Sequence, residues 1–144
     1  MPEIYPIHDK ETLLRCLPVI QSLRPHLHAD NIHHYLDAMQ RQDYHMRYCM
    51  EDDKPAAFMG FRFITHFYSG NIIYVDDLVT FPVNRGKGFA GALLDHVIEL
   101  AKEKGLDGVR LDSGHHRHDA HRLYLNKGFV IASHHFNYKI REPK

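Results

Sequence analysis

The residues best suited to chemistry lie in the loop Pro82–Gly91, where glycines and cationic side chains follow one another. The hydrophobic pattern predicts that a strand ends before this loop and that an amphipathic helix begins at Gly88. Such a helix start directs several unpaired backbone N–H groups, and the positive end of the helix dipole, at one point. Gly86 and Gly88 let the backbone approach an anion without obstruction by a Cβ atom, while Arg85 and Lys87 add positive charge. The sequence therefore predicts a binding site for pyrophosphate or another anion.

Glycine loops also occur in nucleotide-binding proteins, so two other motifs have to be compared. A Walker loop requires Gly, four residues and then Gly-Lys-Ser/Thr, and the sequence has no such run. The dinucleotide fingerprint is matched in spacing by Gly86, Gly88 and Gly91. Here, however, the loop would follow an antiparallel meander and not the first strand of a βαβ unit. Asp112 lies near the place of the required acidic residue, which leaves a nucleotide-linked oxidoreductase as an alternative.

Two adjacent carboxylates, Asp76 and Asp77, lie within the β-favouring segment Ile72–Thr80. Neighbouring residues of a regular strand point to opposite faces, so we expect only one of the two to face a ligand cavity directly. A carboxylate in that position can either bind a cationic amine or accept its proton. The residues alone leave both roles open.

Histidines are numerous, with 14 in the chain, and His115, His116, His118 and His121 are close together in the sequence. A metal site needs three or four convergent ligands, and no HExxH or CxxC spacing accompanies them. We therefore interpret the histidines as a solvated group that partly lines a cavity, and we expect no metal. One of them, if near the reacting groups, is an alternative base.

Apolar periodicity and turn residues predict the elements that position these side chains. We expect one domain over residues 1–144 of class α/β (α+β), in which an antiparallel meander is followed by strand, helix, strand and helix. The expected sheet is mixed and mostly antiparallel, has about six to seven strands and carries helices on both faces. The expected strands are Ile4–Pro6, His45–Met50, Ala56–Phe67, Ile72–Thr80, Gly108–Ser113 and His134–Ile140. The expected helices contain Leu13–Ile20, which Pro18 could kink or divide, then Asp30–Met39, Gly88–Lys104 and Asp119–Lys127.

The composition narrows the range of partners. Lys and Arg together number 18, as do Asp and Glu, so the formal net charge is zero and nothing indicates a nucleic-acid partner. No apolar segment approaches the roughly 20 residues that a membrane span needs, and the N-terminus has no basic stretch followed by an apolar run. Cys16 and Cys49 lie in apolar segments, which favours buried free thiols in a reducing compartment. We expect a cytoplasmic location.

Two motifs carry a resemblance to a known family. Arg85-Gly86-Lys87-Gly88-Phe89-Ala90 fits the pattern Gln/Arg-x-x-Gly-x-Gly/Ala, and the block Ala120–Phe129 fits Ala-x-x-x-Tyr-x-x-x-Gly-Phe. The two motifs are about 30 residues apart and occur in the expected order. On these residues the sequence resembles the GNAT superfamily of N-acetyltransferases, over roughly Ile72–Ile140.

The resemblance implies a site for acetyl-CoA as a co-substrate. The sheet of this family splays between strands four and five, and the pantetheine arm pairs in that gap with exposed backbone groups, as an added strand would. A backbone N–H there also polarises the thioester carbonyl and stabilises the oxyanion. The cofactor-binding residues implied in this way are Leu78, Val79, Thr80, Arg85, Gly86, Lys87, Gly88, Phe89, Ala90 and Gly91.

The resemblance also assigns catalytic roles. It makes Tyr124 the general acid that protonates the coenzyme A sulfur, with Asp76 or Asp77 as base or amine binder. One position departs from the pattern, because Arg117 stands where many members have Asn. That departure puts one contact to the pantetheine or its water in doubt.

The function expected from these residues is transfer of an acetyl group from acetyl-CoA to a primary amine by direct attack. We expect a small-molecule amine, because a compact chain without a recognition domain offers little surface for a protein target. The first two helices would roof the acceptor pocket. Alternatives are acetylation of a protein N-terminus or lysine, and a non-catalytic acyl-CoA-binding sensor or interaction module. A homodimer paired through the last strand or the first helices fits this reading.

Overall fold

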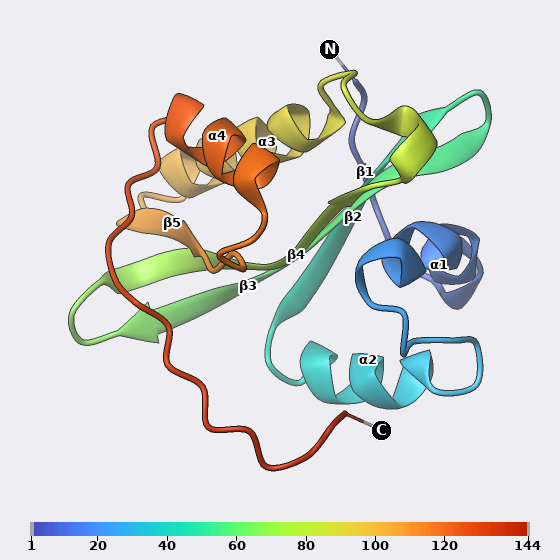
Figure 1. The fold of residues 1–144 in the computed structure, drawn as a ribbon, viewed down its shortest axis with the longest axis horizontal. Helices are drawn as coiled ribbons and strands as arrows, with labels where there is room; N and C mark the ends of the chain where they lie inside the picture. The colour runs from blue at the N-terminus through green and yellow to red at the C-terminus, as the bar shows by residue number, and fades with distance from the viewer. Residues whose placement is uncertain (1, 144) are drawn as a thin grey trace.

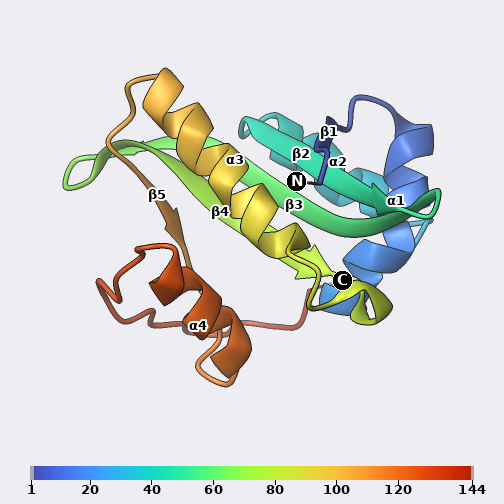
Figure 2. The same cartoon turned by 90° about the horizontal axis from the view of Figure 1, so that it is seen from above.

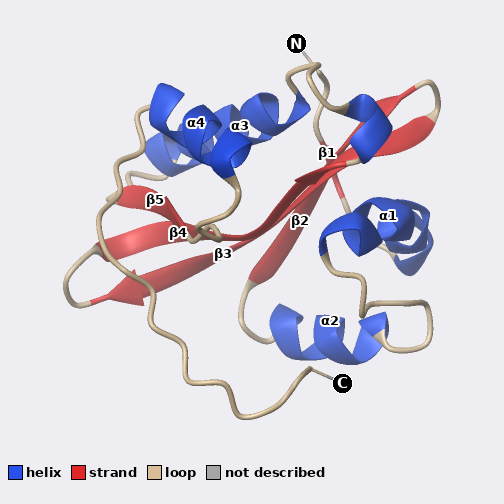
Figure 3. Ribbon diagram, in the orientation of Figure 1, coloured by secondary structure: helices blue, strands red, loops and turns tan. Residues whose placement is uncertain are grey.

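A five-stranded sheet in the order β1-β2-β3-β4-β5 separates two layers of helices (Figures 1 and 3). The computed structural model of the chain describes residues 2–143. Strands β1 to β4 pair antiparallel and β5 pairs parallel to β4. The strands are β1 (Tyr5–Pro6), β2 (Tyr44–Glu51), β3 (Lys54–His66), β4 (Gly70–Thr80) and β5 (Gly108–Leu111). The helices are α1 (Lys10–Leu23), α2 (Ile32–Gln40), α3 (Phe89–Glu103) and α4 (His118–Asn126), with a 3-10 turn at Pro82–Asn84.

The β2–β3 hairpin shows why the chain turns where the sequence predicts. Asp52 and Asp53 both have positive φ angles, 51° and 62°, which is the backbone of the two-residue turn that suits the twist of paired strands. Asp tolerates this conformation better than most residues. The two expected strands His45–Met50 and Ala56–Phe67 are therefore joined by a tight hairpin turn.

The helices cover both faces of the sheet, as predicted (Figure 2). On one face α3 and α4 pack on the sheet around Met59, Phe61 and Leu93, which are 0% exposed. On the other face α1 and α2 pack around a second cluster, which includes Cys16 and Phe58. One buried cluster therefore lies on each face of the sheet, between the strands and a layer of helices. The fold is a mixed α+β fold.

Helix α1 is continuous from Lys10 to Leu23 even though it contains Pro18, so the proline does not divide it. Its first turn is fixed by Asp9, whose side chain accepts a hydrogen bond of 2.7 Å from the backbone N–H of Thr12. Within residues 2–143, no helix is both long enough and apolar enough to cross a bilayer.

The predicted strand His134–Ile140 is wrong, and the expected count of six to seven strands is therefore too high for residues 2–143. The alternation of Phe136, Tyr138 and Ile140 favours an extended chain, but a strand also needs a neighbour to pair with. Here the segment follows α4 as an extended chain that pairs with no strand of the described residues (Figure 1). Phe136 is 93% exposed and Tyr138 is 89% exposed, so neither side chain contributes to a core.

Candidate active site

The glycine loop forms the helix start that the sequence predicts. Gly86 and Gly88 have φ angles of 79° and 86°, a conformation that glycine adopts without steric cost. Helix α3 follows, and its first bond joins the Ala92 N–H to the Gly88 carbonyl at 3.0 Å. The N–H groups of the preceding residues Phe89, Ala90 and Gly91 thus lie ahead of the first intrahelical bond. A Cβ atom on Gly86 or Gly88 would meet no atom within 4 Å, so the loop borders open space.

The charged residues of the loop differ in their environment. Glu51, at the end of β2, accepts hydrogen bonds from Lys87 Nζ at 2.6 Å and from Asn84 Nδ2 at 2.8 Å. The bond from Lys87 lowers the pKa of the Glu51 carboxyl. Lys87 therefore ties the loop to the β2–β3 hairpin, and its charge is shared with Glu51. Arg85 is exposed, whereas Phe89 is only 6% exposed and offers a ligand its backbone alone.

The end of β4 offers backbone groups beside this loop. Pairing between β4 and β5 runs from Ile72–Gly108 to Val75–Leu111, while β4 itself continues to Thr80. Leu78, Val79 and Thr80 pair with β3 on one side. Within the described part of the chain, no strand pairs with these three residues on the other side. An extended ligand could pair with that edge as an additional strand.

A β-bulge sets the direction of the two aspartates. In the β3–β4 ladder Asp77 lies opposite Gly60 and Val75 lies opposite Phe61, so Asp76 is an extra residue without a partner. Asp76 and Asp77 both contact residues of the layer that carries α1 and α2, whereas Val75 belongs to the core beneath α3. The premise that adjacent aspartates point to opposite faces is therefore wrong, because a bulge interrupts the alternation. Only Asp77 lines the cavity described below, so the expectation that one of the two faces a cavity is confirmed.

Asp76 is held by an arginine from the neighbouring strand. Arg62 donates to both of its oxygens, from Nε at 2.9 Å and from Nη2 at 2.8 Å. In this bidentate geometry Arg62 occupies both carboxylate oxygens of Asp76, to which a cationic ligand would otherwise bind. The side chain of Asp76 is 18% exposed, and it is absent from the lining of the cavity described below.

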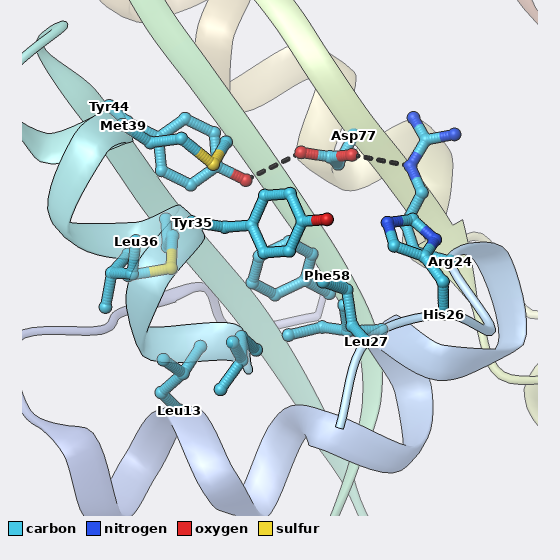
Figure 4. A pocket seen from close by; sticks show the side chains of 13 residues that line it. Leu13, Arg24, His26, Leu27, Tyr35, Leu36, Met39, Tyr44, Phe58 and Asp77 are labelled. Atoms are coloured by element: carbon cyan, nitrogen blue, oxygen red, sulfur yellow. Dashed lines mark hydrogen bonds and ion pairs between the residues drawn. The ribbon is translucent and has the colours of Figure 1, made fainter. Parts of the chain in front are cut away.

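Asp77 lies between a tyrosine and an arginine that are distant in the sequence (Figure 4). Its Oδ2 accepts a hydrogen bond of 2.7 Å from the Tyr44 hydroxyl, and its Oδ1 accepts one of 3.0 Å from Arg24 Nε. Tyr44 belongs to β2 and reaches β4 across Gly60 of β3, where a Cβ atom would come within 1.6 Å of the hydroxyl. Burial, together with the Asp77 charge, raises the pKa of Tyr44, so its hydroxyl stays a donor.

Asp77 also lines a cavity of about 180 Å³ between α1, α2 and the sheet. Side chains of the two N-terminal helices line this cavity. Most of its lining is aliphatic or aromatic, and Figure 4 shows these side chains converging on the space beside Asp77. The lining residues are Leu13, Ile20, Arg24, His26, Leu27, Ile32, Tyr35, Leu36, Met39, Tyr44, Met46, Phe58 and Asp77.

Tyr124 lies in the other layer of the molecule. It is part of α4, packs against the core beneath α3, and makes an edge-to-face contact with Phe129 at 6.1 Å between ring centroids. Burial raises the pKa of Tyr124, and the positive charge of Arg117 acts in the opposite direction. The hydroxyl is thus protonated at neutral pH and able to donate. Within residues 2–143, no hydrogen bond or ion pair joins Tyr124 to Asp76 or Asp77.

The remaining candidate groups are occupied or dispersed. Asp112 accepts a hydrogen bond from the Tyr74 hydroxyl and lies 3.7 Å from His135, so its carboxylate already has partners. Cys16 and Cys49 are free and 0% exposed, and burial raises the pKa of their thiols to about 12 and about 11. Across the described residues, no three His, Cys, Asp or Glu side chains are grouped to hold a metal ion.

Sequence reasoning missed Tyr44, Arg24 and Gly60 as parts of the site. Tyr44 and Arg24 are 33 and 53 residues away from Asp77 in the chain, and no local pattern links them. Gly60 did carry a signal, because a glycine inside an apolar strand often marks a close approach of another group.

Known proteins resemble the chain in sequence and in fold. A sequence profile of the acetyltransferase (GNAT) family matches residues 4–129. The uncharacterized N-acetyltransferase YhdJ of Bacillus subtilis (strain 168) is 33% identical over 137 residues, 94% of each chain. Aminoalkylphosphonate N-acetyltransferase of Salmonella typhimurium is 28% identical over 86 residues, 59% of this chain and 56% of that protein. The fold matches that of AAC(6')-Iy in complex with the bisubstrate analog CoA-S-monomethyl-acetylneamine, with a TM-score of 0.81 and 16% identity over 98% of this chain and 99% of that one.

Proposed function

The chain belongs to the acetyltransferase (GNAT) family, and we propose that it transfers an acetyl group from acetyl-CoA to the primary amine of a small molecule. Membership of this family makes it an acetyl-CoA-dependent acyltransferase. Acetyl-CoA supplies the acetyl group as a thioester. The acceptor and the roles of individual residues are the subject of the proposal.

The residues around the start of α3 fit the diphosphate of acetyl-CoA. The N–H groups of Phe89, Ala90 and Gly91 precede the first helical bond, and Gly86 and Gly88 leave open space beside them. A helix N-terminus of this kind favours a bound anion through its N–H groups and its dipole. Arg85 is exposed and adds a cation, whereas Lys87 acts mainly by fixing the loop to Glu51.

The end of β4 is the proposed place of the pantetheine arm. Leu78, Val79 and Thr80 extend beyond the last β4–β5 pair, Val75–Leu111, and lead directly toward the glycine loop. An arm that pairs with this edge would run between the two strands where the family splay is expected. A backbone N–H in the same stretch would polarise the acetyl carbonyl.

Two side chains move the protons that the reaction requires. Tyr124, whose pKa is raised by burial, donates its hydroxyl proton to the sulfur that leaves as the C–S bond breaks. Asp77 binds the amine in the cavity and accepts, directly or through water, the proton that nitrogen loses as the C–N bond forms. Asp76 is not the base in this proposal, because Arg62 occupies both of its oxygens.

One observation carries the proposal: the unpaired end of β4 runs into a glycine-opened helix start, and Asp77 lies on the same strand next to Leu78. This arrangement supports a proposal in which the diphosphate, the pantetheine arm and the amine are bound along one continuous stretch of chain. In this proposal Tyr124 acts from α4, the helix that follows β5.

The test is release of the coenzyme A thiol from acetyl-CoA in the presence of a panel of primary amines, for the wild type and for Tyr124→Phe. We expect amine-dependent release by the wild type and a loss of about 10²–10⁴-fold in kcat for the variant. Calorimetry should show the same affinity of both proteins for acetyl-CoA. Tyr138→Phe is a matched control, because Tyr138 is 89% exposed on the C-terminal segment.

Three outcomes would contradict the proposal in different ways. Tight binding of acetyl-CoA without turnover of any amine would indicate a sensor or interaction module. Acetylation of protein N-termini or lysines, with small amines left unmodified, would indicate a protein acetyltransferase. Binding of NAD in place of acetyl-CoA would support the dinucleotide reading of Gly86, Gly88 and Gly91.

A further inference from the structure

The cavity beside Asp77 combines a mostly apolar wall with the ion pair of Arg24 and Asp77. This combination bears on the acceptor of the proposed reaction. Its wall consists mainly of aliphatic and aromatic side chains from α1, α2 and the inner strands, among them Leu36, Met39 and Phe58. Asp77 is the single carboxylate of the lining. A pocket of this kind favours a ligand with an apolar body and one polar group.

The charges around the cavity are already balanced in pairs. Arg62 holds Asp76 outside the lining, and Arg24 holds Asp77 within it. A polycation would therefore meet one carboxylate at most, and its other ammonium groups would lose hydration without compensation. An anionic group on the ligand would find Arg24 engaged with Asp77 Oδ1 and, through Nη2 at 3.1 Å, with the Asp76 carbonyl.

Arg24 and Tyr44 differ in how firmly they hold Asp77. The ring of Tyr44 is 8% exposed and lies over Gly60, so its hydroxyl is fixed by packing. The Arg24 side chain follows the last turn of α1 and is 40% exposed, so it can turn toward solvent. Replacement of Arg24 Nε by an incoming ammonium would keep Asp77 paired with a cation throughout.

We propose that the acceptor is a primary monoamine with an uncharged apolar body, whose ammonium takes the place of Arg24 on Asp77 while its alkyl or aryl group fills the cavity. This inference rests on the proposed acetyltransferase function and narrows the acceptor to one chemical class. Tyr44 then positions Asp77, and the Leu36–Met39 side of α2 selects the body of the amine.

The decisive experiment compares kcat/KM for six amines at saturating acetyl-CoA, followed by thiol release. Three of them are apolar monoamines, n-butylamine, n-hexylamine and 2-phenylethylamine. The other three are polar amines: ethanolamine, the zwitterionic 2-aminoethylphosphonate and the polycationic neamine. Each methylene that enters the cavity should raise kcat/KM about fourfold, hence about fifteenfold from n-butylamine to n-hexylamine. Higher kcat/KM for the zwitterionic or polycationic amine than for n-hexylamine would overturn the inference and leave the acetyltransferase function standing.

Two variants on neighbouring positions of α2 test the cavity itself. Met39→Gln keeps the length of a side chain that lines the cavity but makes it polar, and should lower kcat/KM for n-hexylamine about tenfold while ethanolamine changes less than about twofold. Gln40→Met makes the reverse change on the exposed neighbour and should alter neither value. Equal losses for both amines in Met39→Gln would overturn the inference.

Arg24→Gln distinguishes two roles of Arg24, because KM should fall if Arg24 competes with the amine and rise if Arg24 binds the acceptor. If an ammonium replaces Arg24, the variant removes a competitor, and KM for n-hexylamine should fall. If Arg24 binds an anionic group of the acceptor, KM for 2-aminoethylphosphonate should rise, and that result would overturn the inference. Thiol release with none of the six amines, although acetyl-CoA binds, would overturn the proposed function together with the inference.

Discussion

The hydroxyl of Tyr44 lies 1.6 Å from the point that a Cβ atom on Gly60 would occupy. Gly60 is therefore the gap in β3 through which a tyrosine of β2 reaches Asp77 of β4. Residues of three adjacent strands, β2, β3 and β4, thus fix the position of the Asp77 carboxylate at the cavity.

Gly60→Ala should displace the Tyr44 ring and weaken its bond to Asp77. We expect the free energy of unfolding to fall by about 1–3 kcal/mol, the usual cost of overpacking a core. Urea denaturation measures this change. In a Tyr44→Ala background the same substitution should cost much less, and equal costs in both backgrounds would show that the ring is not the obstacle.

Gly88→Ala should weaken acetyl-CoA binding as well as lower the stability of the fold. A left-handed residue other than glycine costs roughly 1–2 kcal/mol, and here the new methyl group also projects into the open space beside the loop. Calorimetry should show at least about a tenfold higher Kd. Gly105→Ala is the matched control, with a φ angle of 66° and similar open space at the far end of α3, and should leave the Kd unchanged.

The two aspartates should separate into a structural and a functional residue. Asp77→Asn should lower kcat/KM for the amine by about 10²-fold or more, since it removes the proposed base. Asp76→Asn should mainly lower stability, by about 1–3 kcal/mol, because Arg62 loses its bidentate partner. Steady-state kinetics and denaturation on both variants check this assignment, and the reverse pattern would refute it.

The proposed role of Tyr124 as general acid predicts how kcat changes at alkaline pH. The protonated phenol is the active form of a general acid, and burial raises its pKa above the ordinary value of 10.0. We therefore expect kcat to fall only above pH 10, and this limb should vanish in Tyr124→Phe. A fall centred below pH 9 that disappears in the variant would contradict the assignment.

His96 should make stability depend on pH in a defined direction. Burial, reinforced by the positive charge of Arg47, lowers the pKa of His96 from its ordinary value of 6.5, and its Nε2 accepts a bond from Arg47 Nε at 3.3 Å. The unfolded chain then binds the proton more readily than the folded one, so this contribution destabilises the protein as the pH falls below 6.5. Above that value both states are neutral and the contribution is absent.

His96→Gln should remove this part of the pH dependence while keeping an acceptor for Arg47. The measurement is the free energy of unfolding at pH 7.5 and pH 5.5 for both proteins. The wild type should lose more stability between the two values than the variant does. An equal loss would show that His96 is not protonated preferentially on unfolding.

The glycine loop and helix start of the candidate site could be predicted because their signals are local. The left-handed glycines Gly86 and Gly88 and the apolar periodicity of α3 lie within a few residues of one another, and they specify the helix start that borders the cradle. Such features depend on backbone conformation and helical period, which neighbouring residues determine. The role of Tyr124 came from the resemblance of the block Ala120–Phe129 to the family motif, and it stays a prediction.

Other features escaped prediction because they depend on contacts across the sheet. The hydrophobic pattern of β4 does not reveal that Asp76 is one residue in excess of its partner strand, so the two aspartates were wrongly expected to point to opposite faces. The segment His134–Ile140 has strand-like alternation, yet alternation states only which side chains share a face. Whether a neighbouring strand is within reach is decided by the path of the whole chain.

The bulge at Asp76 also bears on how this strand tolerates changes in length. Loss of one residue from an interior strand ordinarily turns every following side chain to the wrong face. Here the pairs on either side of position 76, Val75 with Phe61 and Asp77 with Gly60, already fit an uninterrupted ladder once that residue is taken out. A chain shortened by this single aspartate would keep Leu78 under α3 and Val79 under α1. Arg62 would lose its carboxylate partner, and Arg24 Nη2 would lose the carbonyl to which it donates.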